Sequence, residues 1–381
     1  MRTKQPASRD VNELCPVCEN GRSLFHTRVD GYAFYRCLAC GSLHVDRETL
    51  KAVDGGSGTR TYDEAYWDEE LGAARQRATG ESLVRAGEAI LYARRPVKRF
   101  LDVGAGPGFL LDALSKYFPD RVGVFHAIEL FPPAEHSTHP NYIVGDMGDL
   151  SGRFDAGVCI EVVEHLTPLM LKKLAEGLTK ISEPGSLWLF NTGMPEFVLE
   201  HDPAYLDPKR RGHIVSYGLS GLEHIFVPLG FRVSQIPGKN YAWVAEYQLG
   251  DDVPTIESRS PVRENEALLK ECGLLYQAAF ESARASLYME QMLSRTRWAL
   301  KLDSELAAAR NLLRTLQANP ENAGRSGHPL RDELNQLKEA QAALRVEFDR
   351  LNSEHEQTLN SRSWRLTRPL RALARLLRRK G

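Results

Sequence analysis

One glycine-rich stretch, residues 100–111, constrains the fold more than any other part of the sequence. It reads Phe-Leu-Asp-Val-Gly-Ala-Gly-Pro-Gly-Phe-Leu-Leu, which predicts a buried strand, a tight turn and the start of a helix. Its glycines occupy every second position, at Gly104, Gly106 and Gly108. Glycine allows positive φ angles and a close approach to a ligand, although a tight turn needs glycine without any ligand. Asp102 before the turn and Glu129 after the next apolar run favour a ligand site, because doubly wound sheets present a carboxylate to a ribose there.

From residue 99 onward, apolar runs alternate with helical patterns. This alternation predicts an α/β fold with a doubly wound, mostly parallel sheet that binds its ligands at the carboxyl ends of the strands. We expect seven strands, at residues 99–103, 122–128, 141–144, 154–160, 186–191, 230–236 and 241–247, and a helix near 219–229.

A second group of polar residues, Glu161-Val-Val-Glu164-His165, follows the fourth expected strand. If these residues are helical, their i, i+3 and i+4 spacing places both carboxylates and the imidazole on one face. A further histidine, His213, lies in the long segment between the fifth strand and the helix near 219–229. Acids and histidines grouped in this way are compatible both with a catalytic role and with metal binding.

The order of these motifs resembles the class I S-adenosylmethionine-dependent methyltransferases over residues 98–252. The resemblance implies a Rossmann-like sheet that ends in an antiparallel hairpin, with S-adenosylmethionine as the cofactor. It also implies the cofactor-binding residues, Asp102, Gly104, Gly106, Gly108, Glu129, Asp146 and Met147. Asp146 keeps an alternative role as a turn former, and Met147 one as a packing residue. A dinucleotide dehydrogenase more usually has G-x-G-x-x-G, which this turn does not match.

The set of Glu161, Glu164, His165 and His213 resembles the site of metal-dependent O-methyltransferases of ubiquinone biosynthesis and of small-RNA 2′-hydroxyls. In those enzymes four such side chains hold a divalent ion, for example magnesium, against the hydroxyl to be methylated. An ion lowers the pKa of that hydroxyl, and a histidine accepts its proton. Many methyltransferases without a metal also have Glu-His here, so a metal-free catalytic or substrate-lining role stays open.

Four cysteines near the N-terminus form two C-x2-C pairs separated by eighteen residues, Cys15 with Cys18 and Cys37 with Cys40. This spacing is typical of structural zinc sites, in which four thiolates leave no position open for chemistry. With short strands expected near 24–26 and 32–36, it predicts a zinc ribbon over residues 1–50. Two disulfides are the alternative, which a cytosolic chain disfavours.

Residues 51–97 connect the ribbon to the sheet. We expect a flexible linker at 51–60 and one polar helix at about 70–94. By the resemblance, this region lies over the cofactor as a lid that carries Tyr62, Tyr66 and Trp67. The alternative is that these aromatic residues pack the helix against the sheet.

The C-terminal part has a different pattern. Residues 253–360 carry heptad-like leucine positions and predict a helical coiled coil, which favours a homo-oligomer or a glycosyltransferase partner over a helical domain packed on the catalytic one. Residues 361–381 predict a basic amphipathic helix on an anionic membrane surface, with nucleic-acid contact or a solvated end as the alternatives. Their sequence resembles tails of bacterial enzymes of surface-polysaccharide assembly.

The charge of the chain is unevenly distributed. Residues 361–380 hold seven Arg, one Lys and no acid, so removing these eight charges from the net charge of −1 leaves −9 on the rest. The negative net charge of the remaining residues argues against nucleic acid as a partner, and thus against RNA methylation.

The sequence has neither a secretory signal nor an apolar run of ~20 residues, so we expect a cytoplasmic protein, peripheral on the inner membrane face.

These patterns predict a methyltransferase that O-methylates a sugar hydroxyl of a cell-surface glycan or of its precursor, with divalent metal assistance. A sugar C-methyltransferase and a small-molecule O-methyltransferase are close alternatives. A non-catalytic assembly scaffold is the alternative from a different class.

Overall fold

The computed structural model describes residues 13–60, 64–236, 239–250 and 252–256. Apart from Lys239, these residues belong to one compact unit. The tail expected at 361–381 and nearly all of the coiled coil expected at 253–360 lie outside the described residues. No helix among the described residues is both long and apolar enough to cross a bilayer.

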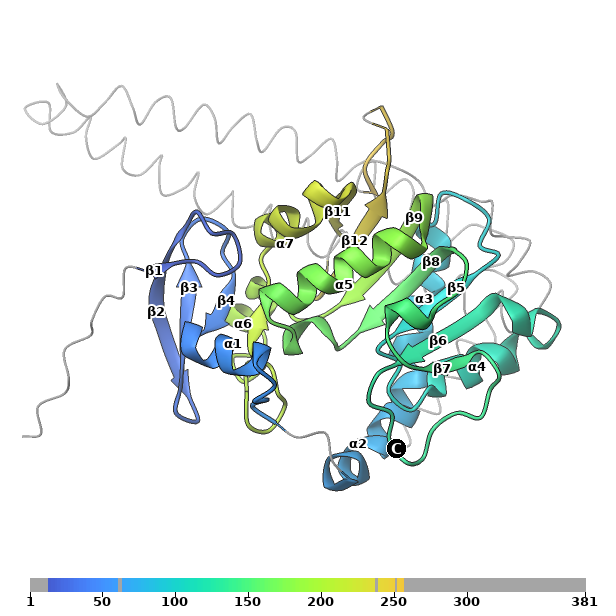
Figure 1. Cartoon of the computed structure of the whole chain (residues 1–381), viewed down its shortest axis with the longest axis horizontal. Coiled ribbons are helices and arrows are strands. Elements are labelled where there is room, and N and C mark those ends of the chain that lie inside the picture. Colours follow the sequence, from blue (N-terminus) through green and yellow to red (C-terminus); the bar gives the residue numbers. More distant parts are fainter. Residues whose placement is uncertain (1–12, 61–63, 237–238, 251, 257–381) are drawn as a thin grey trace, which may run out of the picture. The chain divides into compact units, whose positions relative to one another are not determined.

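A seven-stranded sheet forms the centre of the fold, in the order β11-β12-β9-β8-β5-β6-β7 (Figure 1). Its parallel strands are β5 (Phe100–Val103), β6 (Phe125–Glu129), β7 (Tyr142–Val144), β8 (Phe154–Ile160) and β9 (Ser182–Asn191). The hairpin of β11 (Phe231–Gln235) and β12 (Ala242–Tyr247) adds two antiparallel strands beside β9. All seven expected strands and the α/β class are therefore confirmed, although β6 begins at Phe125 because residues 119–124 form a 3-10 helix.

Helices cover both faces of this sheet. The chain moves from β5 outward to β6 through α4 (Phe109–Tyr117), and from β8 in the opposite direction to β9 through α5 (Pro168–Ile181). Because both crossovers are right-handed, α4 and α5 lie on opposite faces. α5 packs with α7 (Leu219–Phe226), while α3 (Glu81–Tyr92) packs with α4 and on β8 and β9. The short elements are α6 (Pro195–Glu200), η1 (Pro119–Val124), η2 (Met147–Asp149), η3 (Val163–His165) and η4 (Val227–Leu229).

A second, five-stranded antiparallel sheet contains the N-terminal strands. They are β1 (Glu13–Leu14), β2 (Arg22–Val29), β3 (Tyr32–Cys37) and β4 (Leu43–Val45), and β2 and β3 are the two strands expected from sequence. The fifth strand, β10 (Val215–Ser216), comes from the segment after β9 and pairs with β4. The ribbon sheet is thus completed by residues far along the chain.

Two expectations about the connecting region are wrong. Residues 51–54 are not a linker, because they belong to α1 (Arg47–Asp54), where Asp46 accepts a hydrogen bond from the Thr49 amide and Leu50 and Val53 are buried. The helix expected at about 70–94 is two helices, α2 (Glu64–Ala78) and α3, which are separated at Gly80.

Tight packing in the middle of the sheet allows no side chain at Gly157 of β8. A Cβ there would lie 2.4 Å from Trp188 Cζ3 and 2.5 Å from the Leu101 carbonyl oxygen. Trp188 is fully buried, and its Nε1 donates a hydrogen bond to Ser182 Oγ at 2.8 Å, so the indole has little freedom to move.

We expect Gly157→Ala to lower the free energy of unfolding by about 2 kcal/mol or more, because the methyl group overpacks the sheet. Gly87→Ala is the matched control, since a Cβ on Gly87 of α3 meets no atom within 4 Å. Alanine should stabilise that helix slightly. Urea unfolding of both variants tests this, and equal midpoints for Gly157→Ala and the wild type would contradict it.

Candidate functional site

The glycine turn between β5 and α4 has the backbone that its sequence predicts. Gly104, Gly106 and Gly108 have φ angles of 70°, 52° and 76°. A Cβ would lie 2.6 Å from a Val162 side-chain carbon at Gly104 and 2.6 Å from the Tyr142 ring at Gly108. Both the conformation and the packing therefore require glycine.

Two acids lie at this turn. Glu129, at the carboxyl end of β6, accepts hydrogen bonds from the Gly106 amide through Oε2 and from the Phe131 amide through Oε1, both at 2.8 Å. Asp102 of β5 is 5% exposed, and burial together with the charge of Glu129 raises its pKa to about 7. The turn therefore combines a half-buried glycine backbone with two carboxyl groups, and this negative potential suits a ligand that carries positive charge.

The next two sequence-predicted residues have visible structural roles. Asp146 is exposed and caps η2, where its Oδ1 accepts a hydrogen bond from the Gly148 amide at 2.6 Å. Met147 lies over Gly177 of α5, since a Cβ on that glycine would be 3.0 Å from the Met147 Cβ. Contact of either residue with a cofactor stays a prediction.

An aromatic side chain from α2 covers the glycine turn. A Cβ on Gly106 would lie 3.3 Å from Trp67 Cη2, and Trp67 packs edge-on against Tyr66 with ring centroids 4.9 Å apart. Trp67 thus lies against the turn, which is compatible with a lid and with plain packing, and its role over a cofactor stays a prediction. Tyr62 lies outside the described residues.

The acids and histidine after β8 come together, but not through a helix face. Glu161 adopts a left-handed φ of 54°, which ends the strand, and the single 3-10 turn of η3 carries Glu164 and His165. The expected i, i+3 and i+4 helical spacing is therefore wrong. Asn191, at the end of β9, fixes Glu161 by donating Nδ2–H to its Oε1 at 2.8 Å and by accepting its amide hydrogen at 2.9 Å.

His213 completes the cluster from the long segment after β9. Its Nδ1 lies 2.7 Å from the Tyr205 carbonyl oxygen, and since a carbonyl only accepts, Nδ1 carries the hydrogen and Nε2 keeps its lone pair. Nε2 lies 3.8 Å from Glu164 Oε1, and the ring centroids of His213 and His165 are 4.8 Å apart. One ligand atom from each of these three residues falls within 4.8 Å of the others.

Glu164 is the centre of the cluster. Its side chain is completely buried, and Oε1 accepts a hydrogen bond from the Tyr205 hydroxyl at 2.9 Å. Its Oε2 is buried and has no well-aligned hydrogen bond among the described residues, although the Glu161 carboxyl and the Thr192 hydroxyl lie near enough to the Glu164 carboxylate to influence its pKa. Such an oxygen beside an imidazole lone pair fits a bound cation, because a buried acceptor without a partner is costly.

Burial also determines the charges in this cluster. It raises the pKa of Glu161 well above its usual value, helped by the negative charge of Glu164. It lowers the pKa of His213 to about 2, with a further contribution from His165. Both imidazoles are consequently neutral at physiological pH, which is the form that binds metal ions or accepts protons.

Three contributors were not predicted from the sequence. Asn191 could have been found as a polar residue at the carboxyl end of a strand, but nothing local marks Tyr205. Arg60 lies 4.3 Å from the centroid of the Tyr66 ring, and its charge contributes to the lowered pKa values of His165 and His213.

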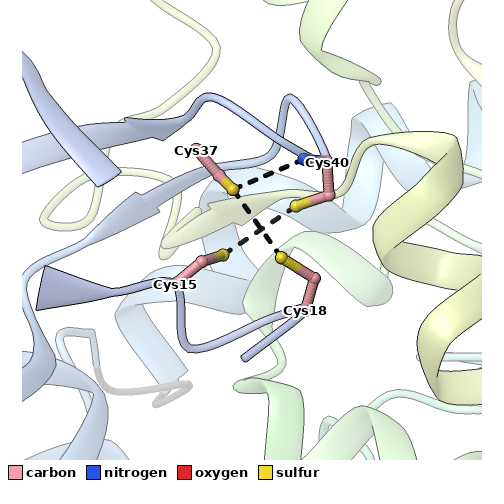
Figure 2. A group of neighbouring side chains, drawn as sticks. All are labelled: Cys15, Cys18, Cys37 and Cys40. Atoms are coloured by element: carbon pink, nitrogen blue, oxygen red, sulfur yellow. Dashed lines mark hydrogen bonds between the residues drawn. The ribbon is translucent and has the colours of Figure 1, made fainter. Parts of the chain in front are cut away.

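The four cysteines of the ribbon form a separate cluster, as Figure 2 shows. All four are free and buried, and their sulfurs lie within 4.8 Å of one another. The Sγ atoms of Cys15 and Cys40 are 3.8 Å apart, and those of Cys18 and Cys37 are 3.7 Å apart. Sulfurs at the corners of a tetrahedron about 2.3 Å from zinc are about 3.8 Å apart, so this arrangement is compatible with zinc.

Comparisons with known proteins yield fold similarity only. No protein-family model matches the chain, and no curated protein does. Among solved structures it is similar to DesVI from Streptomyces venezuelae, with 17% identity over 49% of this chain and 99% of that chain and a TM-score of 0.35.

Two further structures have comparable scores. One is magnesium protoporphyrin IX methyltransferase from Synechocystis with bound S-adenosylmethionine, with 12% identity over 47% of this chain and 82% of that chain and a TM-score of 0.31. The other is an O-methyltransferase of neocarzinostatin biosynthesis in complex with S-adenosylmethionine and a naphthoic acid, with 18% identity over 51% and 62% of the two chains and a TM-score of 0.34.

We expect the contribution of Asp102 to the free energy of unfolding of the ligand-free protein to fall as the pH rises from about 4 to 7, because its folded-state pKa, about 7, lies above its ordinary value of 3.8. Asp102→Asn removes this loss, so its advantage over the wild type should grow by about 2 kcal/mol between pH 5 and pH 8. Urea titrations at both pH values measure it, with Asp120→Asn at an exposed position of η1 as the control. Parallel pH dependences for Asp102→Asn and the wild type would refute the assignment.

We further expect Cys18→Ser and Cys37→Ser to lower the zinc content of the purified protein and to destabilise the ribbon, because a four-thiolate site loses most of its affinity with one ligand. Cys159→Ala is the control, since Cys159 is buried in β8 outside the cluster. Elemental analysis gives the zinc content per chain. Unchanged zinc in both serine variants would rule out the cluster as its site.

Proposed function

We propose that this chain is an S-adenosylmethionine-dependent O-methyltransferase that acts on a sugar hydroxyl of a cell-surface glycan or of its precursor. The observation that carries the proposal is the buried cluster of Glu164, His165 and His213 beside the glycine turn. Val162 joins the two sites, because its side chain packs on Gly104 while its neighbours carry the cluster. An acceptor held by the cluster is therefore close to a cofactor held by the turn.

The glycine turn is the proposed cofactor site. The glycine turn, whose amides already hydrogen-bond to Ile128, Glu129 and Ala105, offers a tight bend that a ligand can approach closely. The carboxyl groups of Asp102 and Glu129 add an anionic surface, and the indole of Trp67 covers the turn. S-adenosylmethionine supplies an activated methyl group on a positively charged sulfur. Because the methyl donor is already activated, the protein has chiefly to align the acceptor and remove its proton.

The acid and histidine cluster is the proposed acceptor site. Neutral His213 presents Nε2 with its lone pair free, and the hydrogen bond from Nδ1 to the Tyr205 carbonyl fixes the ring and makes Nε2 more basic. With a pKa of about 2, His213 is a weak base in the ligand-free protein, so its fixed lone pair is better suited to bind a cation or to accept a hydrogen bond from the acceptor hydroxyl than to remove the proton by itself.

The same residues fit a divalent cation such as magnesium. Glu164, His165 and His213 would hold it, with Glu161 as a neighbour held by Asn191, and the unpartnered Oε2 of Glu164 is the supporting observation. A divalent ion lowers the pKa of a hydroxyl bound to it. The chelator experiment below separates this case from catalysis without a metal.

The remaining parts of the proposal rest on sequence. The glycan acceptor is supported by the resemblance of residues 361–381 to tails of surface-polysaccharide enzymes. Association of residues 253–360 with a second copy or with a glycosyltransferase, and contact of residues 361–381 with an anionic membrane surface, remain predictions, as do the cytoplasmic location and the four-cysteine zinc.

The test is transfer of labelled methyl groups from S-adenosylmethionine to lipid-linked oligosaccharide of the source organism, with and without chelator. We expect Glu164→Gln and His213→Ala to lower the rate by about 10²–10⁴-fold while cofactor binding persists, because they remove acid–base chemistry and not the glycine turn. Glu196→Gln, at an exposed position of α6, is the matched control.

Each alternative has its own outcome in this experiment. Label on carbon instead of oxygen would identify a C-methyltransferase, and label only on small hydroxylated molecules would exclude the glycan. Absence of cofactor binding would overturn the methyltransferase assignment and leave the assembly scaffold.

A further inference from the structure

We propose that the four-cysteine centre, when loaded with metal, is a positioning element for the segment that carries His213, and that Ser42 is the residue that links them. The proposal goes beyond methyl transfer and does not require it. It depends on contacts that connect the second C-x2-C pair to residues 213–221.

The first contact is the hydroxyl of Ser42. Ser42 is fully buried, and its Oγ lies 3.2 Å from Cys40 Sγ and accepts a hydrogen bond from the Gly218 amide at 2.9 Å. A serine hydroxyl also has one hydrogen to donate. A metal-bound thiolate at Cys40 can only accept, so the loaded cluster completes a chain from Gly218 through Ser42 to Cys40. Hydrogen bonds to charged groups are the stronger ones.

The second connection is the strand pairing between β4 and β10. Leu43 and His44 pair with Ser216 and Val215, and the Val45 amide donates to the Ile214 carbonyl at 3.0 Å. This pairing begins directly after Ser42 and ends beside His213.

The third connection leads from that strand to the candidate active site. The Ile214 amide donates to the Glu164 carbonyl oxygen at 2.9 Å. His213 therefore directly precedes the residue that is bonded both to Glu164, through its amide, and to Val45 of the ribbon sheet, through its carbonyl. A shift of β10 along β4 would displace His213 Nε2 from Glu164.

Two glycines show how closely the segment packs on the cysteine pairs. A Cβ on Gly218 would lie 2.0 Å from the Cys40 carbonyl oxygen. A Cβ on Gly221 would lie 2.7 Å from Val17 and 2.8 Å from Ser42 Oγ. Packing this close, to the Cys40 backbone at Gly218 and to side chains at Gly221, transmits a change in either part to the other.

The experiment compares amide hydrogen exchange in a peptide that covers residues 212–219 among three proteins, all with and without chelator. These are the full-length wild type, Ser42→Ala and Ser23→Ala. Ser23 is the matched control, because it is a buried serine of the same sheet whose Oγ contacts His44 Nε2 at 2.9 Å. A peptide from β9 reports any global unfolding.

We expect exchange in residues 212–219 to accelerate about tenfold in zinc-loaded Ser42→Ala and at least as much in the chelated wild type, as the loss of a buried hydrogen bond predicts. Zinc-loaded Ser23→Ala should exchange like the loaded wild type, and the β9 peptide should not change. In the cobalt-substituted protein, Ser42→Ala should keep four-thiolate absorption bands but shift their charge-transfer energy, since one sulfur loses its O–H donor.

Three results would overturn the proposal. The first is unchanged exchange in Ser42→Ala despite full zinc occupancy, and the second is an equal acceleration in Ser23→Ala. The third is a wild type whose cysteines bind neither zinc nor cobalt. If Ser42→Ala does not fold, the loaded and chelated wild type still decide whether metal at the cysteines controls residues 212–219. All of these readouts are independent of methyl transfer, so failure of the proposed reaction leaves this test intact.

Discussion

The burial of one carboxylate, that of Glu164, organises the part of the fold that carries the candidate chemistry. A carboxylate without access to water must be satisfied by fixed groups, because unpaired buried charge costs several kcal/mol. Here the Tyr205 hydroxyl satisfies one oxygen, while the Glu164 backbone carbonyl accepts the Ile214 amide. The long segment after β9 is thereby held against η3. The position of His213 follows from these two contacts, since it lies between the residues that make them.

The same segment also joins the ribbon to the sheet. β10 occupies the edge of the ribbon sheet next to β4, and the Thr167 hydroxyl, at the N-terminus of α5, donates to Asp54 at the end of α1. Sequence patterns suggested a metal module followed by a linker and a separate enzyme fold. Hydrogen bonds instead connect the two parts directly, so the ribbon sheet is paired with the segment that carries His213.

Local sequence signals predicted the fold well. Seven strands, the glycine turn and the convergence of the cysteines each depend on short-range patterns of polarity, glycine and spacing. Features that depend on contacts between distant segments were missed or mistaken. No local sequence pattern indicates the left-handed backbone conformation of Glu161, because this conformation is fixed by hydrogen bonds to Asn191 on the neighbouring strand. Tyr205 was not predicted because its role, a hydrogen bond from its hydroxyl to the buried Glu164 carboxylate, arises only in the folded protein. The antiparallel hairpin of the sheet was expected from the resemblance and not from the residues themselves, and the strand order was not predicted.

Because β10 completes the ribbon sheet, the ribbon cannot finish folding until residues far along the chain have been synthesised. Residues 15–40 contain all four cysteines, so a metal can close that part as soon as it leaves the ribosome. β4 nevertheless remains an unpaired edge until Val215 and Ser216 are made, well over a hundred residues later. Exposed edges are templates for wrong pairing, and contacts between distant residues form slowly. The nascent chain is therefore most vulnerable to association with other chains in the interval between completion of the cysteine cluster and synthesis of β10.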